Sequence, residues 1–487
     1  MYSEFVYMKR AAMLFVGLLL CSFAHAELKM SNICTDGMVL QQKTMASIWG
    51  TASPGAHISV TTSWNGATVR SKASSDGRWI VKVSTPEAGY GHHSITVEGD
   101  GATIKVNDVL IGEVWLASGQ SNMQMPMCGF YNCPVENAAE YICAPPAVNK
   151  IRMFSVPAKL SYELQDEADA QWKGADSESV PWMSAVAYFY ARKLNQMLDV
   201  PVGIISCAYG GARIETWTPK EILETYPDED LSREHIESLI HYHRPYMAYN
   251  AMLHPVKGYS IKGFIWYQGC SNVGKHDQFI ERMSNMIGHW RECWGDKDAS
   301  LPFYMVELAP YRNKPQSATP YFALLREVQH KAAKELPNCG CIVTNDLVES
   351  YEQDNIHPAR KKEVGERLAY MALHRNYGFH KIACDSPEAV RCYRTANSCE
   401  LAVEFTHMDN GISRWMEIEG LEVAGSDGVF YPVTCAFYGS EPKALLIRSE
   451  FVPDPCEVRY GWGDFRPGNL RNVEGLPVTP FRIRSGN

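Results

Sequence analysis

The stretch of chain that decides the fold lies at residues 112–123 and reads GEVWLASGQSNM. An apolar run ends at Gly119, and Ser121 follows at the start of a polar segment. This pattern is typical of a buried strand that ends in a turn, with the serine just beyond the strand end. A serine in such a place can act as a nucleophile if a general base lies beside it. The rest of the chain is therefore expected to supply a base, a group that orients the base, and donors for an oxyanion.

A candidate base lies at residues 354–358, which read DNIHP. Asp354 and His357 are three residues apart, so one turn of chain can place both side chains on the same side of a site. An imidazole can accept a serine proton near neutral pH, and a carboxylate can orient the ring and stabilise the imidazolium. A helix-capping aspartate beside a surface histidine would give the same short pattern.

Two further strand patterns end in glycine turns. Residues 202–211 read VGIISCAYGG, and residues 263–272 read GFIWYQGCSN. A backbone N–H of the glycine pair and the side-chain amide of Asn272 would together bind a tetrahedral oxyanion, each donor lowering the barrier by about 3 kcal/mol. Gly211 is the expected backbone donor, with Gly210 as the alternative, because the sequence does not say which N–H points inward. An ordinary tight turn after a strand is the other interpretation of each segment.

Strand and helix patterns alternate between about residues 109 and 378, which indicates a parallel sheet. Apolar residues at helical spacing mark helices near residues 186–197 and 279–290. Predicted strands end at Ser118, Ala208, Tyr267 and Leu347, and every candidate segment follows one of these ends. Open α/β sheets bind ligands beyond the carboxyl ends of their strands, so the four segments are expected to meet at one edge.

The flanking regions have a different pattern. Residues 27–108 and 379–487 contain short alternating apolar runs broken by turn residues, which predicts an N-terminal β-sandwich and a C-terminal β domain. Residues 1–26 contain a basic pair, an apolar stretch and a small-x-small cleavage pattern at 24–26, which predicts a signal peptide and export to the periplasm or beyond the cell. No other segment predicts a membrane span.

Charge and cysteine content argue against some classes of function. The net charge is -9 without a basic run, which argues against binding to nucleic acid. Fourteen cysteines follow residue 26, a number that fits an oxidising compartment and disulfides in irregular loops, although the pairing cannot be read. Zinc at Cys339-Gly340-Cys341 or His241-Tyr242-His243 is an alternative, but neither motif has a second ligand pair at finger-like spacing. We expect no metal and no organic cofactor, and the oligomeric state is not predicted.

The four segments occur in the order serine, glycine, asparagine and Asp-x-x-His. In this order the chain resembles the SGNH hydrolase superfamily, and more narrowly the sialate O-acetylesterase group of carbohydrate esterases. Further matching segments lie at residues 38–42 (MVLQQ), 214–217 (IETW), 475–477 (GLP) and 480–482 (PFR). One departure is Cys270, where that group usually has a glutamate. The resemblance implies an SGNH (flavodoxin-like) parallel-sheet hydrolase over residues 109–378, flanked by the two β domains.

The resemblance also implies the roles of the site residues. Ser121 would attack an acetyl ester of a sugar, His357 would take its proton, and Asp354 would orient His357. Gly211 and Asn272 would bind the oxyanion. Three further residues are expected to contact the substrate, namely Gln120, Arg213 and Gln268.

The substrate is expected to be an O-acetylated sialic acid or sialoglycan. Arg213 could bind its carboxylate in a bidentate pair, although a structural salt bridge is the alternative. Trp217, Trp266 and Tyr267 could stack on a sugar or simply belong to the core. Acetylated xylan or another plant glycan is the rival substrate, and a non-catalytic glycan-binding protein is the rival of another class. A peptidase of the α/β-hydrolase type is disfavoured because Ser121 lacks the Gly-x-Ser-x-Gly elbow.

Overall fold

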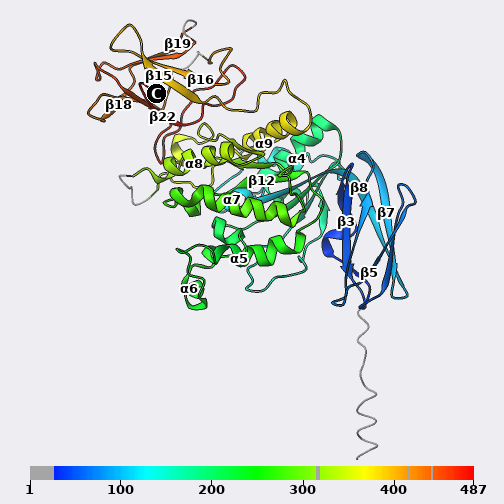
Figure 1. The fold of residues 1–487 in the computed structure, drawn as a ribbon. Helices are drawn as coiled ribbons and strands as arrows, with labels where there is room; N and C mark the ends of the chain where they lie inside the picture. The colour runs from blue at the N-terminus through cyan, green and yellow to red at the C-terminus, as the bar shows by residue number, and fades with distance from the viewer. Residues whose placement is uncertain (1–26, 314–318, 414–416, 440–442, 487) are drawn as a thin grey trace, which may run out of the picture.

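The computed structural model describes residues 27–313, 319–413, 417–439 and 443–486. The predicted signal peptide lies outside the described residues. Within these ranges, no helix is both long enough and apolar enough to cross a membrane. Figure 1 shows β structure at both ends of the described chain, on opposite sides of a central α/β region.

One long strand, β8 (Ala102–Gly119), belongs to both the N-terminal β region and the central sheet. Its first part pairs with β7 (Gly89–Gly99) and then with β2 (Val39–Gln41). Its second part pairs in parallel with β11 (Val202–Ala208) on one side and β12 (Gly263–Tyr267) on the other. The boundary expected at residue 108 falls inside this strand. The chain therefore passes from one region to the other without leaving a strand.

The N-terminal region consists mainly of antiparallel strands, as the alternating sequence pattern predicts, although β2 pairs in parallel with β8. Inward-facing side chains such as Ile58, Val60, Trp79 and Val81 are buried, while their neighbours along each strand are more exposed. The remaining strands of this region are β1 (Lys29–Met30), β3 (Met45–Thr51), β4 (His57–Thr62), β5 (Thr68–Lys72) and β6 (Arg78–Ser84).

The central sheet has the strand order β10-β9-β11-β8-β12-β13-β14. Strand β9 (Ile151–Ser155) is parallel to β11, and β13 (Phe303–Val306) and β14 (Cys339–Ile342) are parallel to their neighbours. Strand β10 (Trp172–Gly174) is the edge and pairs antiparallel with β9. From β11 to β14 the order is second, first, third, fourth and fifth strand along the chain, which is the flavodoxin-like order. Strands β9 and β10 extend that sheet beyond β11.

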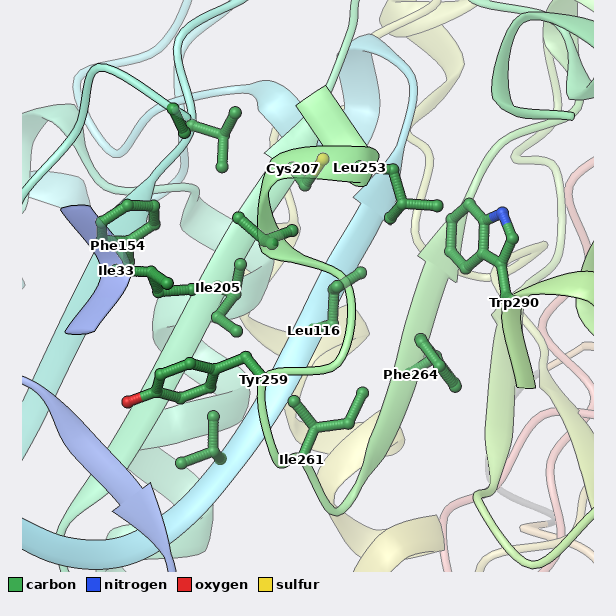
Figure 2. Close-up of a cluster of buried hydrophobic side chains, with 14 of the residues drawn as sticks. Ile33, Leu116, Phe154, Ile205, Cys207, Leu253, Tyr259, Ile261, Phe264 and Trp290 are labelled. Carbon is green, nitrogen blue, oxygen red and sulfur yellow. The ribbon is translucent and has the colours of Figure 1, made fainter. Parts of the chain in front are cut away.

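Helices cover both faces of the central sheet. Helices α7 (His276–Cys293) and α8 (Tyr321–Glu335) share a core with Leu116 and Phe264, whereas α4 (Ala185–Leu198) and α9 (Lys361–Asn376) share a core with Trp115 and Ile265. Successive strand residues point to opposite faces, so a continuous apolar run serves both cores. Figure 2 shows Leu116, Ile205 and Phe264 from three neighbouring strands within the first core. The helices predicted at 186–197 and 279–290 are confirmed as α4 and α7.

Shorter helices occupy the connections between the larger elements. They are α2 (Ser121–Gln124), α3 (Ala138–Cys143), α5 (Lys220–Leu223), α6 (Arg233–Ser238), η1 (Asn32–Cys34), η2 (Val180–Trp182), η3 (Ile214–Trp217), η4 (His241–His243), η5 (Tyr249–Leu253), η6 (His254–Val256), η7 (Cys270–Asn272) and η8 (Ser350–Glu352).

The C-terminal region contains two four-stranded antiparallel sheets. An ion-pair network attaches this region to the central one, because buried Asp346 pairs with Arg367 of α9 at 2.7 Å and with Arg471 at 2.8 Å. The strands are β15 (Ala389–Arg394), β16 (Leu401–Phe405), β17 (Leu421–Ala424), β18 (Phe430–Pro432), β19 (Cys435–Tyr438), β20 (Leu445–Arg448), β21 (Glu457–Tyr460) and β22 (Phe481–Arg484).

The cysteines differ from the expectation of disulfides. All fourteen cysteines in the described ranges are free thiols. Several, including Cys34, Cys207 and Cys392, are buried among apolar side chains, where a thiol packs as a small hydrophobic group. Burial raises the pKa of the Cys34 thiol to about 12, so this group stays protonated.

A buried carboxylate joins the N-terminal region to the central sheet. Glu113 of β8 accepts hydrogen bonds from Gln41 Nε2 at 3.1 Å, Gln42 Nε2 at 2.6 Å and the Tyr377 hydroxyl at 2.6 Å. The backbone N–H of Val114 in turn donates to Gln41 Oε1 at 2.8 Å. The glutamines of the MVLQQ segment therefore hold β8 at the point where it enters the central sheet.

We predict that Glu113→Ala lowers the free energy of unfolding by about 3 kcal/mol or more, because three donors, one buried and two partly buried, lose a charged acceptor. Urea unfolding followed by circular dichroism measures the change. Glu113→Gln keeps the shape and should cost less, and Glu98→Ala on the exposed face of β7 should cost little. Equal stabilities for Glu113→Ala and Glu98→Ala would contradict the role of this carboxylate.

Candidate active site

Ser121 lies at the carboxyl end of β8, directly after a turn that requires glycine. Gly119 has a φ of +136°, and a Cβ there would lie 2.2 Å from the carbonyl oxygen of Tyr267. The same carbonyl accepts the Gln120 N–H at 3.0 Å. Only a residue without a side chain permits so close an approach. The turn places Ser121 at the first position of α2, above the end of β12.

The structure brings Ser121 and His357 together. The Nε2 atom of His357 lies 2.8 Å from Ser121 Oγ, within hydrogen-bonding distance. Asn355 holds the loop of His357, since its Oδ1 accepts the His357 N–H and its Nδ2 donates to the His357 carbonyl, both at 2.9 Å. Burial, with a smaller contribution from the charge of Lys361, lowers the pKa of His357 to about 4. The imidazole is therefore neutral at neutral pH and can accept a proton.

Asp354 has a different partner from the expected one. Its carboxylate forms an ion pair with Arg312, whose Nε donates to Oδ1 at 2.8 Å and whose Nη2 contacts Oδ2. The other ring nitrogen of His357, Nδ1, instead lies 3.9 Å from the sulfur of Cys133. The side chain of Asp354 is about half exposed, so it is accessible to rearrangement. Orientation of His357 by Asp354 stays a prediction.

The glycine pair after β11 has two distinct environments. The Gly210 N–H donates to Gln124 Oε1 at 2.8 Å. The Gly211 N–H has no acceptor among the residues that the structure describes. Gly211 has a φ of +75°, and a Cβ there would lie 2.5 Å from the Tyr242 ring. Gly211 is thus the glycine whose N–H is available to a ligand.

Asn272 is buried, and three hydrogen bonds fix the orientation of its amide. Its Oδ1 accepts from the Ile214 N–H at 3.1 Å and from Gln268 Nε2 at 2.6 Å. Its Nδ2 donates to Glu215 Oε2 at 3.0 Å. An amide nitrogen carries two hydrogens, so one remains for another acceptor.

The two glutamines expected to contact substrate are both buried. Gln120 Oε1 accepts the Gly269 N–H at 2.9 Å, and Gln268 Nε2 donates to the Ala212 carbonyl at 3.1 Å. These bonds join the loops that follow β8, β11 and β12. A contact of either glutamine with substrate stays an expectation.

Arg213 lies immediately before η3 and is half-buried. Its Nη2 atom lies 2.9 Å from Nδ1 of His243. Burial and the charge of Arg213 lower the pKa of His243 to about 4, so this ring is neutral and can accept from the guanidinium. The structural salt bridge considered for Arg213 does not occur within the described parts of the chain. The guanidinium is thus held in place by a neutral group.

The large aromatic side chains near the strand ends belong to the core. Trp217, Trp266 and Tyr267 are all buried, and the rings of Trp217 and Trp266 meet edge to face at 6.4 Å. They are enclosed and cannot stack on a sugar in this conformation. No group of three or more His, Cys, Asp or Glu side chains arranged to hold a metal ion occurs in the described ranges.

Sequence reasoning missed the residues that join nucleophile and base. Asn122 follows Ser121 directly, and its Nδ2 donates to the carbonyl of Ile356, the residue before His357, at 2.9 Å. Lys361 donates from the other side to Asn122 Oδ1 at 2.5 Å. The sequence signal that could have identified Asn122 is its place in the GQSNM segment, directly after Ser121. A lysine four residues after His357 gives no sign that it is buried.

Comparison with known proteins identifies the family of the chain. A family model described as carbohydrate esterase, sialic acid-specific acetylesterase, matches residues 111–374. The chain belongs to this family. Human sialate O-acetylesterase is 30% identical over 391 residues, covering 74% of this chain and 73% of the human protein. The mouse sialate O-acetylesterase is 29% identical over 404 residues, covering 72% and 74% respectively. The family expected from the four segments is therefore confirmed.

A solved structure extends the similarity to almost the whole chain. The crystal structure of a carbohydrate acetylesterase from Xanthomonas citri superposes with a TM-score of 0.80 at 32% identity. The match covers 93% of this chain and 99% of that protein. The similarity to this protein therefore extends beyond residues 111–374, the part matched by the family model.

The pKa of His357 leads to a pH prediction. We expect kcat/KM for an acetyl ester to be constant from neutral pH down to about pH 5 and to fall about tenfold per pH unit below pH 4, because only the neutral imidazole accepts the serine proton. Acetate release measured by ion chromatography gives the profile, and circular dichroism at each pH verifies that the protein is folded. An acid limb near the ordinary histidine pKa of about 6.5 would contradict the buried environment of His357.

Proposed function

We propose that the protein removes O-acetyl groups from sialic acid through a serine acyl-enzyme. The observation that supports this most strongly is the 2.8 Å contact between Ser121 Oγ and His357 Nε2 at the carboxyl end of a parallel sheet. It occurs in a chain of the sialic acid-specific acetylesterase family. A serine beside a neutral imidazole is the minimum arrangement for nucleophilic attack on an ester.

In the proposed reaction, Ser121 Oγ attacks the acetyl carbonyl carbon while His357 Nε2 takes the serine proton. The resulting oxyanion accepts hydrogen bonds from the Gly211 N–H and Asn272 Nδ2, with the Ser121 N–H as a third donor. The bond to the sugar oxygen breaks, and His357 gives its proton to that oxygen. Water then attacks the acetyl group on Ser121 with His357 again as base. The bond between the acetyl carbon and Ser121 Oγ breaks, His357 returns the proton to Oγ, and acetate is released.

Asp354 is assigned as the group that orients His357 during this cycle. It would have to turn from Arg312 toward Nδ1, the ring nitrogen that now faces Cys133. The imidazolium formed after proton transfer favours such a move, since a positive ring attracts a carboxylate more strongly than a neutral one. Exposure of the Asp354–Arg312 pair to solvent weakens that ion pair and lowers the cost of the change.

The choice of sialic acid rests on Arg213 and on the names of the relatives. The half-buried guanidinium lies at the loop of Gly211, and the ring that its Nη2 contacts, His243, is neutral and does not balance its charge. A sialic acid carries a carboxylate that would match such a group in a bidentate pair. Curated human and mouse relatives are both named sialate O-acetylesterase.

Acetylated xylan or another neutral plant glycan is the second candidate substrate. The observation in its favour is the Xanthomonas citri protein, which is 32% identical and is described only as a carbohydrate acetylesterase. A non-catalytic glycan-binding role is disfavoured, because such proteins have no need of a hydrogen-bonded serine and histidine. Export to the periplasm or beyond the cell stays a prediction from residues 1–26.

The first test compares acetate release from O-acetylated sialic acid and from acetylated xylan. Wild type is expected to act on the sialic acid, and Ser121→Ala to lose about 10⁴-fold or more in kcat because the nucleophile is absent. Ser63→Ala, on the exposed surface of the N-terminal region, serves as the control. Release of acetate from xylan alone would agree with the mechanism but contradict sialic acid as the substrate. Release of acetate by Ser121→Ala would contradict the mechanism.

The second test concerns the carboxylate. Arg213→Ala is expected to raise KM for an acetylated sialoside about tenfold to a hundredfold, with a much smaller effect on a neutral acetylated sugar, because a bidentate pair is lost. Arg213→Lys should recover part of the affinity, since an ammonium keeps the charge but not the fork. Arg233→Ala, an exposed arginine paired with Glu237, should leave both substrates unaffected. Equal effects of Arg213→Ala on both substrates would contradict the assignment of Arg213 as the group that binds the sialic acid carboxylate.

A further inference from the structure

Lys361 is a buried lysine directly beneath the candidate site. It is the first residue of α9, and only 1% of its surface is exposed. Its Nζ donates to Asn122 Oδ1 at 2.5 Å and lies over the Tyr267 ring, 5.6 Å from the centroid. No ion pair of Lys361 occurs in the described part of the chain. Lysine is rarely buried unless a charged partner compensates it, so this position needs a reason.

The hydrogen bonds of Asn122 supply that reason. Asn122 follows the nucleophile, and its Nδ2 donates to the carbonyl of Ile356, which precedes the base. In its charged form Lys361 can only donate, so the ammonium fixes which side of the Asn122 amide carries the oxygen. The nitrogen must then face Ile356. A single chain of two hydrogen bonds thus connects α9, the start of α2 and the loop of His357.

Lys361 also acts on the site through its charge. Its ammonium lowers the pKa of His357, in addition to the larger effect of burial. Burial lowers the pKa of Lys361 itself to about 7, although three neighbouring groups act in the opposite direction. These groups come from three separate segments and are Cys270, Glu352 and Cys133.

Stability alone does not explain the burial of this amine. Taking an ammonium out of water is costly, and replacing a buried charge by an apolar side chain of similar size is often neutral or stabilising. An apolar residue at position 361 would fill the same space without that cost. It would, however, leave the Asn122 amide free to turn over, since Oδ1 would lose its donor.

We propose that Lys361 is a positioning residue, which through the Asn122 amide holds Ser121 and His357 at hydrogen-bonding distance. This inference rests on the proposed function, because it takes Ser121 and His357 as the reacting pair. It adds a residue outside the serine, histidine and aspartate to the machinery of the site. Lys361 touches neither the substrate nor the reacting atoms and acts through Asn122.

The test is Lys361→Met, which keeps the unbranched apolar part of the side chain and removes its terminal donor and charge. We expect the second-order rate of Ser121 labelling by a fluorophosphonate, and kcat/KM for an acetyl ester, to fall about tenfold to a hundredfold, because a small misplacement of reacting groups has effects of this size. KM should change little. When the labelling rate and kcat/KM are each measured against pH, the acid limb of both profiles should move to higher pH. The reason is that a positive charge near His357 has been removed, which raises the pKa of His357.

Lys362→Met is the matched control, since Lys362 is the next residue on α9 and interacts with Tyr141. Its rates and its acid limb should equal those of wild type. A folded Lys361→Met protein with wild-type labelling rate and wild-type acid limb would overturn the inference. If in that case the wild type is active and Ser121→Ala is inactive, the proposed function still holds and only the role of Lys361 is wrong.

Asn122→Asp keeps the test decisive if Lys361→Met fails to fold. A carboxylate at this position still accepts from Lys361 but has no N–H for the Ile356 carbonyl. Slower labelling of Ser121 by at least about tenfold is the expected result. Labelling at the wild-type rate would show that the link between nucleophile and base is not needed, and would overturn the inference.

Discussion

The site depends on the approach of Gly119 to the carbonyl oxygen of Tyr267, which no side chain at position 119 would permit. Two neighbouring parallel strands, β8 and β12, end side by side at these residues. The turn that follows carries Ser121 over the end of β12, and the loop of Asn272 starts from that same end. Backbone packing between two strands therefore sets where the nucleophile and one oxyanion donor lie, before any side chain contributes.

Much of this arrangement could be predicted from residue patterns. Apolar runs that end in glycine located the ends of β8, β11 and β12 to within one residue, because parallel strands buried on both faces leave a clear apolar signal. The fourth strand end was predicted at Leu347, but β14 ends at Ile342. Residues 343–347 are buried without being in a strand, since the Thr344 N–H bonds to the buried Glu307 carboxylate instead of a neighbouring strand.

Other features depend on contacts between distant residues, and no local pattern reveals them. The Arg312–Asp354 pair joins residues 42 positions apart, whereas the histidine expected to pair with Asp354 is only three positions away. Burial of Lys361 arises from the packing of α9 against the end of the sheet, whereas a lysine at a helix start usually lies in solvent. The thiols remained free because many lie singly in apolar surroundings, where cysteine number alone is a poor guide to pairing.

The continuity of β8 limits how this molecule can be divided. A fragment starting at residue 109 would begin in the middle of a strand and lack the pairing partners β7 and β2. It would also lack Gln41 and Gln42, the donors to Glu113. The start of the strand would then have unpaired backbone N–H and C=O groups at an exposed sheet edge. The N-terminal β region is thus an integral part of the hydrolase and not a separable module. Exchanging this region between relatives would require matched residues on both sides of β8.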